Sequence, residues 1–346
     1  MFTQIELTTL LDWAVLPSNN ADELFDEPEV NDALAWAKTL PLPEKNDVLT
    51  SLSARLPSLD AAKASALLVF GGSLVEDGAS PVILLASGLE HLTRLRQLQD
   101  AGPPPAEAVW RFTVIGLMAL LCRSAPGRAL FKQQAETLAW LGANEDLSGH
   151  FDYLLRLAET SDEEVLWVLF PDQETGLEVS VSQVNNTFHL LTLLQPLVLA
   201  QAAALKLKKR PALASAELLR FAQGDHTASP EGTDRNLWEW LNALAYEGGP
   251  LNPAQFAAGD ASVSSQPRVR GNVLLLATER EKYLQRSWDA GFLASLHDAH
   301  RPAVRLRRRL PAAEVRGLLV EMHPPVAPPA PAAAPPRSLW QRLWRK

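Results

Sequence analysis

Residues 165–184 run Val165-Leu-Trp-Val-Leu-Phe170, then Pro171-Asp-Gln-Glu-Thr-Gly176, then Leu177-Glu-Val-Ser-Val-Ser-Gln-Val184. The first run is short and apolar, and the last alternates apolar and polar residues without interruption. Alternation with a period of two is typical of a strand with one buried face, and the proline and glycine between the runs suit a turn. The stretch therefore predicts a β-hairpin at about residues 165–184. An isolated hairpin is only marginally stable in water, so we expect further strands to share its sheet.

Later segments of the chain are the candidates for those strands. Residues 269–277 suit a strand around Gly271, residues 303–310 alternate, and residues 315–322 could pair with residues 303–310. This places strands at about 269–277 and 303–322. We expect helices between the hairpin and these strands, over about residues 187–208, 213–223 and 237–246. Residues 161–322 are thus predicted to form a small α+β region.

Residues 1–160 carry a helical pattern, in which short segments with Pro, Gly, Ser or Asp separate runs rich in Ala and Leu. We expect helices over about residues 2–14, 28–39, 44–56, 61–76, 81–100, 106–122, 128–141 and 145–159. The junction Asp77-Gly-Ala-Ser-Pro81 is the clearest, because Gly78 suits the left-handed residue after a helix and Pro81 suits the start of the next. No fixed repeat period is present, which favours an irregular helical bundle or array over a solenoid.

The predicted fold class is therefore mostly α, with an irregular helical bundle or array over residues 1–160 followed by the smaller α+β region. The region over residues 323–336 is predicted to be a disordered Pro/Ala-rich linker, and residues 337–346 a short amphipathic tail. The chain has 346 residues, of which 47% are hydrophobic and 21% charged, so it can bury a full core.

Composition and charge narrow the class of protein. The single cysteine, Cys122, cannot form an internal disulfide, which fits a reducing compartment. We find no signal peptide and no transmembrane span, and expect a soluble cytoplasmic protein. Residues 1–264 carry 17 Lys/Arg against 34 Asp/Glu, whereas residues 265–346 carry 15 against 6. The acidic body argues against general binding to nucleic acid, because phosphates would meet a repulsive field.

The C-terminal residues carry the strongest indication of function. Residues 324–336 contain 7 Pro and 5 Ala, and a short basic segment with two tryptophans follows them. On a helix its large apolar residues fall on one stripe, with the basic residues largely off it. The residues expected to bind a partner protein or a membrane are Leu339, Trp340, Arg342, Leu343, Trp344, Arg345 and Lys346. Burying four large side chains contributes roughly 6–12 kcal/mol, while ordering about nine residues costs about 1–2 kcal/mol each, so one tail should bind weakly.

Other residues suggest chemistry less strongly. If residues 303–310 form a strand, Arg305, Arg307 and Arg309 share one face and could bind anions. Gly71 and Gly72 lie within a helix, where we expect them to permit a close helix–helix approach. His91 is expected at the surface, whereas His189 is expected to be partly buried and hydrogen-bonded. We expect no metal site and no cofactor, because no set of ligands or catalytic motif accompanies the histidines.

We accordingly expect a non-enzymatic adaptor or scaffold that its C-terminal tail recruits to a partner protein or to an anionic membrane surface. Peripheral membrane attachment and self-association into a homo-oligomer are both compatible with such a tail. The alternative is an enzyme or small-ligand-binding protein, with its site between the helical and α+β regions, near His189, His226 and the face of Arg305. A deep pocket with convergent polar groups would favour that alternative.

Overall fold

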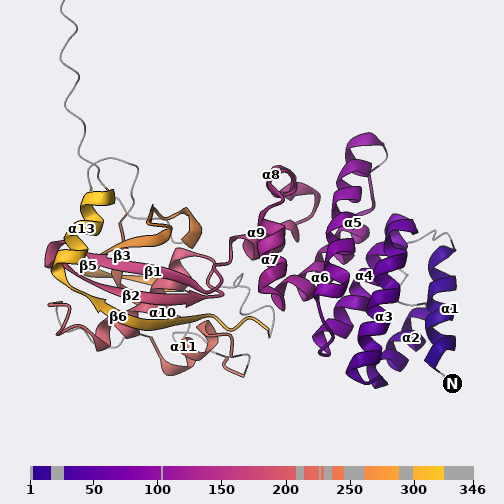
Figure 1. The fold of residues 1–346 in the computed structure, drawn as a ribbon, viewed down its shortest axis with the longest axis horizontal. Coiled ribbons are helices and arrows are strands. Elements are labelled where there is room, and N and C mark those ends of the chain that lie inside the picture. Colours follow the sequence, from indigo (N-terminus) through magenta and orange to yellow (C-terminus); the bar gives the residue numbers. More distant parts are fainter. Residues whose placement is uncertain are drawn as a thin grey trace, which may run out of the picture.

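A computed structural model describes residues 3–16, 27–102, 104–207, 214–225, 227–229, 236–244, 261–287 and 299–322. The linker and tail predicted over residues 323–346 lie outside this part of the chain. A helical array and a sheet-containing region lie side by side along the long axis of the molecule (Figure 1). This is the mostly α fold, with a helical array before a smaller α+β region, that the sequence predicts. The placement of a domain boundary near residue 160 stays a prediction.

The helical array contains α1 (Thr3–Val15), α2 (Pro28–Thr39), α3 (Leu42–Arg55), α4 (Ala61–Glu76), α5 (Val82–Ala101), α6 (Glu107–Cys122), α7 (Ala125–Lys132), α8 (Ala135–Ala143) and α9 (Phe151–Glu159). The side chain of Asp60 caps α4 by accepting from the Lys63 N–H. Gly78 adopts a left-handed φ of +101° directly after α4, as its place in the sequence predicts. The expectation of one helix over residues 128–141 is wrong. The hydroxyl of Ser124 caps a separate helix, α7, which ends before α8 begins.

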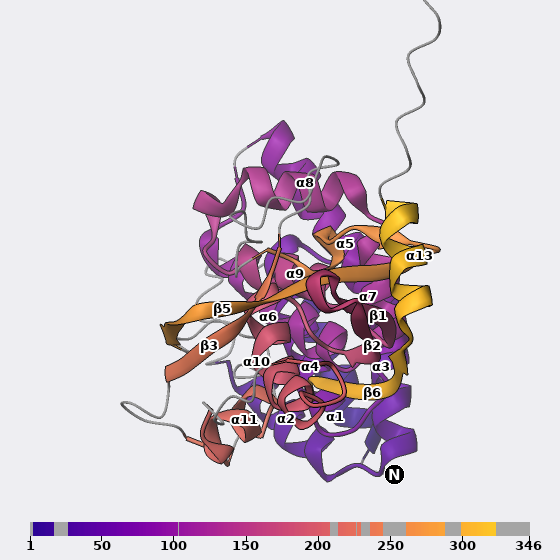
Figure 2. The ribbon, with the colours of Figure 1, turned by 90° about the vertical axis from the view of Figure 1, so that its left-hand side faces the viewer.

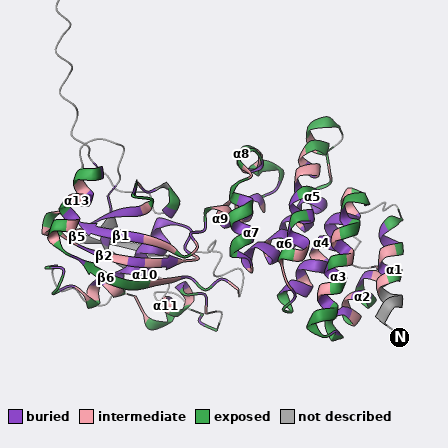
Figure 3. Ribbon diagram, viewed as in Figure 1, coloured by how far each residue is buried: buried purple, intermediate pink, exposed green. Residues whose placement is uncertain are grey.

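The centre of the array is a close contact between α4 and α6. A Cβ atom at Gly72 would lie 3.1 Å from the Cβ of Ala119, and one at Gly116 would lie 2.8 Å from the backbone of Leu68. The backbones of the two helices can approach this closely only because the side chains are missing. A Cβ atom at Gly71 would clash with the side chain of Leu84 on α5, so the interpretation of Gly71 and Gly72 as packing positions is confirmed. Figure 3 shows buried residues on both α4 and α6.

The sheet has the order β3-β5-β1-β2-β6, with β4 also paired to β5. Its strands are β1 (Glu164–Phe170), β2 (Thr175–Ser182), β3 (Asn236–Ala243), β4 (Arg268–Val269), β5 (Asn272–Ser287) and β6 (Ala303–Leu310). The hairpin prediction is confirmed, because β1 and β2 pair in antiparallel register with Val168 opposite Leu177. β1 also pairs in parallel with β5, which makes the sheet mixed.

Helices cover both faces of this sheet. Val168, Val179 and Val273 belong to one buried cluster together with residues of α10 (Thr187–Ala200) and α11 (Ala216–Ala222). Trp167 and Leu274 belong to a second cluster together with α13 (Ala312–Met322). Figure 1 shows α13 on one side of the strands and α10 with α11 on the other. Figure 2 looks along the long axis, with the sheet in front of the helical array.

The structure corrects several boundaries in this region. The strand expected over residues 303–322 ends at Leu310, because Pro311 precedes the helix α13 and its carbonyl accepts a hydrogen bond from the Val315 N–H. The strand expected over residues 269–277 is two strands, β4 and β5, joined by a tight turn in which Arg270 and Gly271 both have positive φ.

Two expected helices also differ from the structure. The helix expected over residues 237–246 is the strand β3, in which pairing with β5 outweighs the helix propensity of Leu and Ala. The helix expected over residues 187–208 ends at Ala200, and a left-handed residue, Lys206, follows in the turn after it.

Candidate functional site at the junction of the two regions

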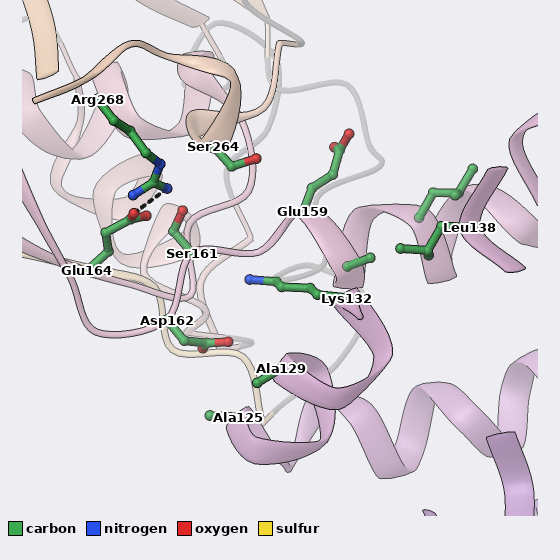
Figure 4. A pocket seen from close by; sticks show the side chains of 12 residues that line it. Ala125, Ala129, Lys132, Leu138, Glu159, Ser161, Asp162, Glu164, Ser264 and Arg268 are labelled. Atoms are coloured by element: carbon green, nitrogen blue, oxygen red, sulfur yellow. Dashed lines mark ion pairs between the residues drawn. The ribbon is translucent and has the colours of Figure 1, made fainter. Parts of the chain in front are cut away.

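A cavity of about 590 Å³ lies where the helical array meets the α+β region. Its walls come from α7, α8 and α9, from the segment that leads into β1, and from the segment that leads into β4 (Figure 4). The residues that line it are Ala125, Ala129, Lys132, Leu138, Leu155, Ala158, Glu159, Ser161, Asp162, Glu164, Ser264 and Arg268. Its volume is in the range of cavities that bind small molecules.

A buried ion pair holds the two regions together beside this cavity. Arg128 of α7 is 1% exposed, and its guanidinium donates to both carboxylate oxygens of Asp162 at 2.8 and 2.7 Å. The remaining terminal nitrogen donates to the carbonyl oxygens of Leu121 and Cys122 at the end of α6. A bidentate pair with further carbonyl acceptors compensates the desolvation of the guanidinium. The start of β1 is thereby fixed against the ends of α6 and α7.

Lys132 and Glu159 are the charged groups of the wall that form no ion pair with a described residue. The Lys132 ammonium donates to the carbonyl oxygen of Thr160, and burial lowers its pKa although the carboxylates of Asp162 and Glu164 oppose this. Burial likewise raises the pKa of Glu159. No ion pair joins Lys132 to Glu159, and both residues are exposed overall.

The junction also holds a hydroxyl with unused hydrogen-bonding capacity. Ser161 is 4% exposed, its N–H donates to the carbonyl of Val184, and its Oγ has no hydrogen-bond partner among the described residues. Figure 4 shows the side chains of Ser161 and Lys132 projecting into the same space. On the same wall, Glu164 forms an ion pair with Arg268, so those two charges compensate each other.

The sequence-predicted arginines lie elsewhere, on the edge strand β6. A bulge opposite Glu178 and Val179 interrupts the alternation, so Arg305 pairs with Ser180 whereas Arg309 pairs with Leu177 on the opposite face. Arg307 lies at the bulge, with its side chain 3.7 Å from the carboxylate of Glu178. The expectation that Arg305, Arg307 and Arg309 share one face is therefore wrong, since a single extra residue reverses the direction of the side chains after it.

The histidines do not converge on a site in the described part of the chain. His189 is fully buried at the start of α10, where its Nε2 donates to the carbonyl of Ala222, and burial lowers its pKa to about 4. This confirms that His189 is hydrogen-bonded, while His226 lies outside the described residues.

His91 is also buried rather than on the surface, and burial lowers its pKa to about 3. Its Nδ1 accepts from Arg94, so Nε2 carries the proton and donates to Ser65, which in turn contacts Thr113. His91 is buried because it lies on the side of α5 that faces α4 and α6. The sequence of α5 alone does not reveal this contact.

The comparisons with known proteins assign no relative. No protein-family model matches the chain, and neither the curated proteins nor the solved structures contain a match to it. Within the described ranges, no three His, Cys, Asp or Glu side chains are grouped so that they could hold a metal ion. In the same ranges, no helix combines the length and the apolar character needed to cross a membrane.

The cavity lies between the two regions, as the ligand-binding alternative expects, but other residues form it. Neither His189 nor Arg305 lines it. The sequence signal that was available is the polar run Glu159-Thr-Ser-Asp-Glu-Glu164, which separates an apolar helix from an apolar strand. Polar connections held by a rigid scaffold commonly carry binding residues.

Proposed function

We propose that this chain is a non-enzymatic adaptor or scaffold that its C-terminal residues attach to a partner protein. One observation carries the proposal: a Pro/Ala-rich stretch over residues 324–336 is followed by a basic segment with Leu and Trp at helical spacing. Such a spacer favours extended conformations of about 3.1 Å per residue, giving a reach of roughly 40 Å. A segment with this spacing is suited to fold on contact with an apolar groove.

The helix α13, which precedes the Pro/Ala-rich stretch, supports this role because it is firmly packed against the sheet. The side chains of Val315, Leu318 and Met322 are buried on the inner face of α13. Ion pairs also fasten α13 to the sheet region, joining Arg308 to Glu314, Arg270 to Glu321 and Arg316 to Glu174. Tension on the C-terminal segment would therefore be transmitted to the whole sheet.

The chemistry of the segment defines the partner. Leu339, Trp340, Leu343 and Trp344 require an apolar groove, and the basic residues around them require acidic groups at its rim. Because the estimated gain and cost for one segment nearly cancel, charge attraction or several copies must supply the affinity. The proposal thus includes self-association or a multivalent partner in the cytoplasm. An anionic membrane surface is the competing occupant.

The test compares the full chain with a Trp340→Ser/Trp344→Ser variant, with Ser338→Ala as the matched control. Proteins cross-linked to each form in its own cell type are quantified, and each form is sedimented with vesicles of phosphatidylcholine containing phosphatidylserine. We expect the double variant to lose specific cross-linked proteins that the full chain and the control retain. If the double variant lost vesicle binding but kept all its cross-linked proteins, the segment would bind a membrane and not a protein partner.

Salt gives a second readout. The amount of partner protein cross-linked to the full chain should fall as ionic strength rises, because exposed charges are screened over about 8 Å at 0.15 M. Identical recoveries for the full chain and the double variant, or tight binding that ignores salt, would remove the basis of the adaptor proposal.

A further inference from the structure

The junction cavity offers hydrogen-bond donors at one place on its wall. The Oγ of the buried Ser161 has no hydrogen-bond partner in the part of the chain that the structure describes, and a buried hydroxyl left unsatisfied is unfavourable. The Lys132 ammonium has three N–H groups, of which the structure uses one for the carbonyl of Thr160. Both side chains project into the same space (Figure 4). A ligand group that fits them must accept hydrogen bonds and carry negative charge.

Neither Asp162 nor Glu164, the acidic residues whose charges act on Lys132, forms an ion pair with it. Asp162 is fully engaged by Arg128, and Glu164 is paired with Arg268. These two pairs account for the four groups, and Lys132 forms no ion pair of its own with a described residue.

Other parts of the cavity wall are apolar. Leu138 of α8 and Leu155 of α9 are partly buried there, and three alanines of α7 and α9 complete the surface, namely Ala125, Ala129 and Ala158. Small side chains leave room for an apolar body of a ligand, and contact with it would remove this surface from water.

Glu159 limits the total charge of the ligand. Its carboxylate lies on the far side of the space from the Glu164–Arg268 pair in Figure 4 and has no ion-pair partner among the described residues. A second anionic group on the ligand would be repelled by this carboxylate. A ligand with one negative charge avoids that repulsion.

We propose that this cavity binds a small monocarboxylate with an apolar body, whose carboxylate accepts hydrogen bonds from Lys132 Nζ and Ser161 Oγ while the body lies against Leu138 and Leu155. The site is independent of the C-terminal segment and goes beyond the adaptor role. A bound acid would contact residues of both regions at their junction.

The test uses the full chain and four probes of equal carbon number: octanoate, octan-1-ol, octylamine and the diacid suberate. Binding is followed by ligand-observed NMR titration. Octanoate should bind at least tenfold more tightly than each of the other three, since only it carries one carboxylate and an apolar body. Inorganic phosphate, added as a competitor, should not displace it.

Four variants test the residues. Lys132→Gln should weaken octanoate binding at least tenfold, and Ser161→Ala several-fold, whereas the exposed Lys38→Gln is the matched control and should change nothing. Ser161→Ala should not lower the urea midpoint, because the hydroxyl has no partner among the described residues to lose. Glu159→Gln should selectively strengthen the binding of suberate.

The proposal is overturned if octan-1-ol or octylamine binds as tightly as octanoate, or if phosphate displaces octanoate. It is also overturned if Ser161→Ala and Lys132→Gln, both folded by their urea transitions, bind octanoate like the unmodified chain. None of these results bears on cross-linking by the C-terminal segment, so the two proposals fail separately.

Discussion

Removing the carboxylate of Asp162 should destabilise the protein far more than removing an ordinary surface carboxylate. In Asp162→Ala, the guanidinium of Arg128, which is 1% exposed, would lose two short charge-assisted hydrogen bonds. It would keep its two carbonyl acceptors at the end of α6. Breaking a buried pair by removing one partner costs about 3–5 kcal/mol.

The structure places Asp162→Ala at the lower end of this range. The side chain of Asp162 is 18% exposed, so water can reach the space that the carboxylate leaves. We therefore expect a loss of about 3 kcal/mol in the free energy of unfolding, measured as a lower urea midpoint at unchanged slope. The protein should remain folded, because domains have about 5–15 kcal/mol of stability.

The matched control is Asp152→Ala, which removes an ion pair of similar length. Arg156 and Asp152 lie 2.7 Å apart on α9, but their side chains are 32% and 46% exposed. An exposed pair of this kind contributes about 0.3–0.5 kcal/mol. If Asp162→Ala cost no more than Asp152→Ala, the assignment of the Arg128–Asp162 pair as the clamp between the two regions would be refuted.

Other predictions concern pH and packing. Between pH 7 and pH 5 the free energy of unfolding should fall by about 2 kcal/mol for each of His91 and His189, because the unfolded histidines gain protons near pH 6.5 while the folded ones, with pKa values of about 3 and about 4, do not. Urea titrations at both pH values should show a smaller fall in His91→Gln, and an unchanged fall would contradict the neutral, buried state of His91. Gly116→Ala would place a Cβ atom 2.8 Å from the backbone of Leu68 and should destabilise by about 1–3 kcal/mol. In Gly142→Ala on α8, the added Cβ atom would have no described neighbour within 4 Å, so this variant should be more stable by about 0.5–1 kcal/mol. Equal urea midpoints for Gly116→Ala and Gly142→Ala would argue against the close α4–α6 contact.

Local signals in the sequence predict most of the fold. The alternation over residues 177–184 identifies β2, and Asp60 and Gly78 mark the ends of α4 through capping and a left-handed φ. These features depend on neighbours in sequence, so periodicity and turn chemistry are sufficient to find them. β3 escapes this reasoning because its backbone is set by pairing with β5, which lies later in the chain.

The cavity could not be predicted in detail from the sequence, for the same reason. Lys132 and Ser161 come together only because Arg128 and Asp162 fix the end of α7 against the start of β1. No pattern on α7 or on the segment before β1 indicates that contact by itself. The bulge in β6 is a further case. It puts Arg305 and Arg309 on opposite faces, and no residue of β6 indicates the bulge in the sequence.

The parallel pairing of β1 with β5 has a consequence for the newly made chain. Leu166 of β1 pairs with Val273 of β5, more than one hundred residues later, whereas its antiparallel partner β2 follows within a short turn. At about 5–20 residues per second, β5 leaves the ribosome roughly 5–20 s after β1. During that interval one edge of β1, a strand of mainly apolar residues, has no partner. During synthesis there is thus a period in which the edge of β1 can pair with a wrong strand or bind a chaperone.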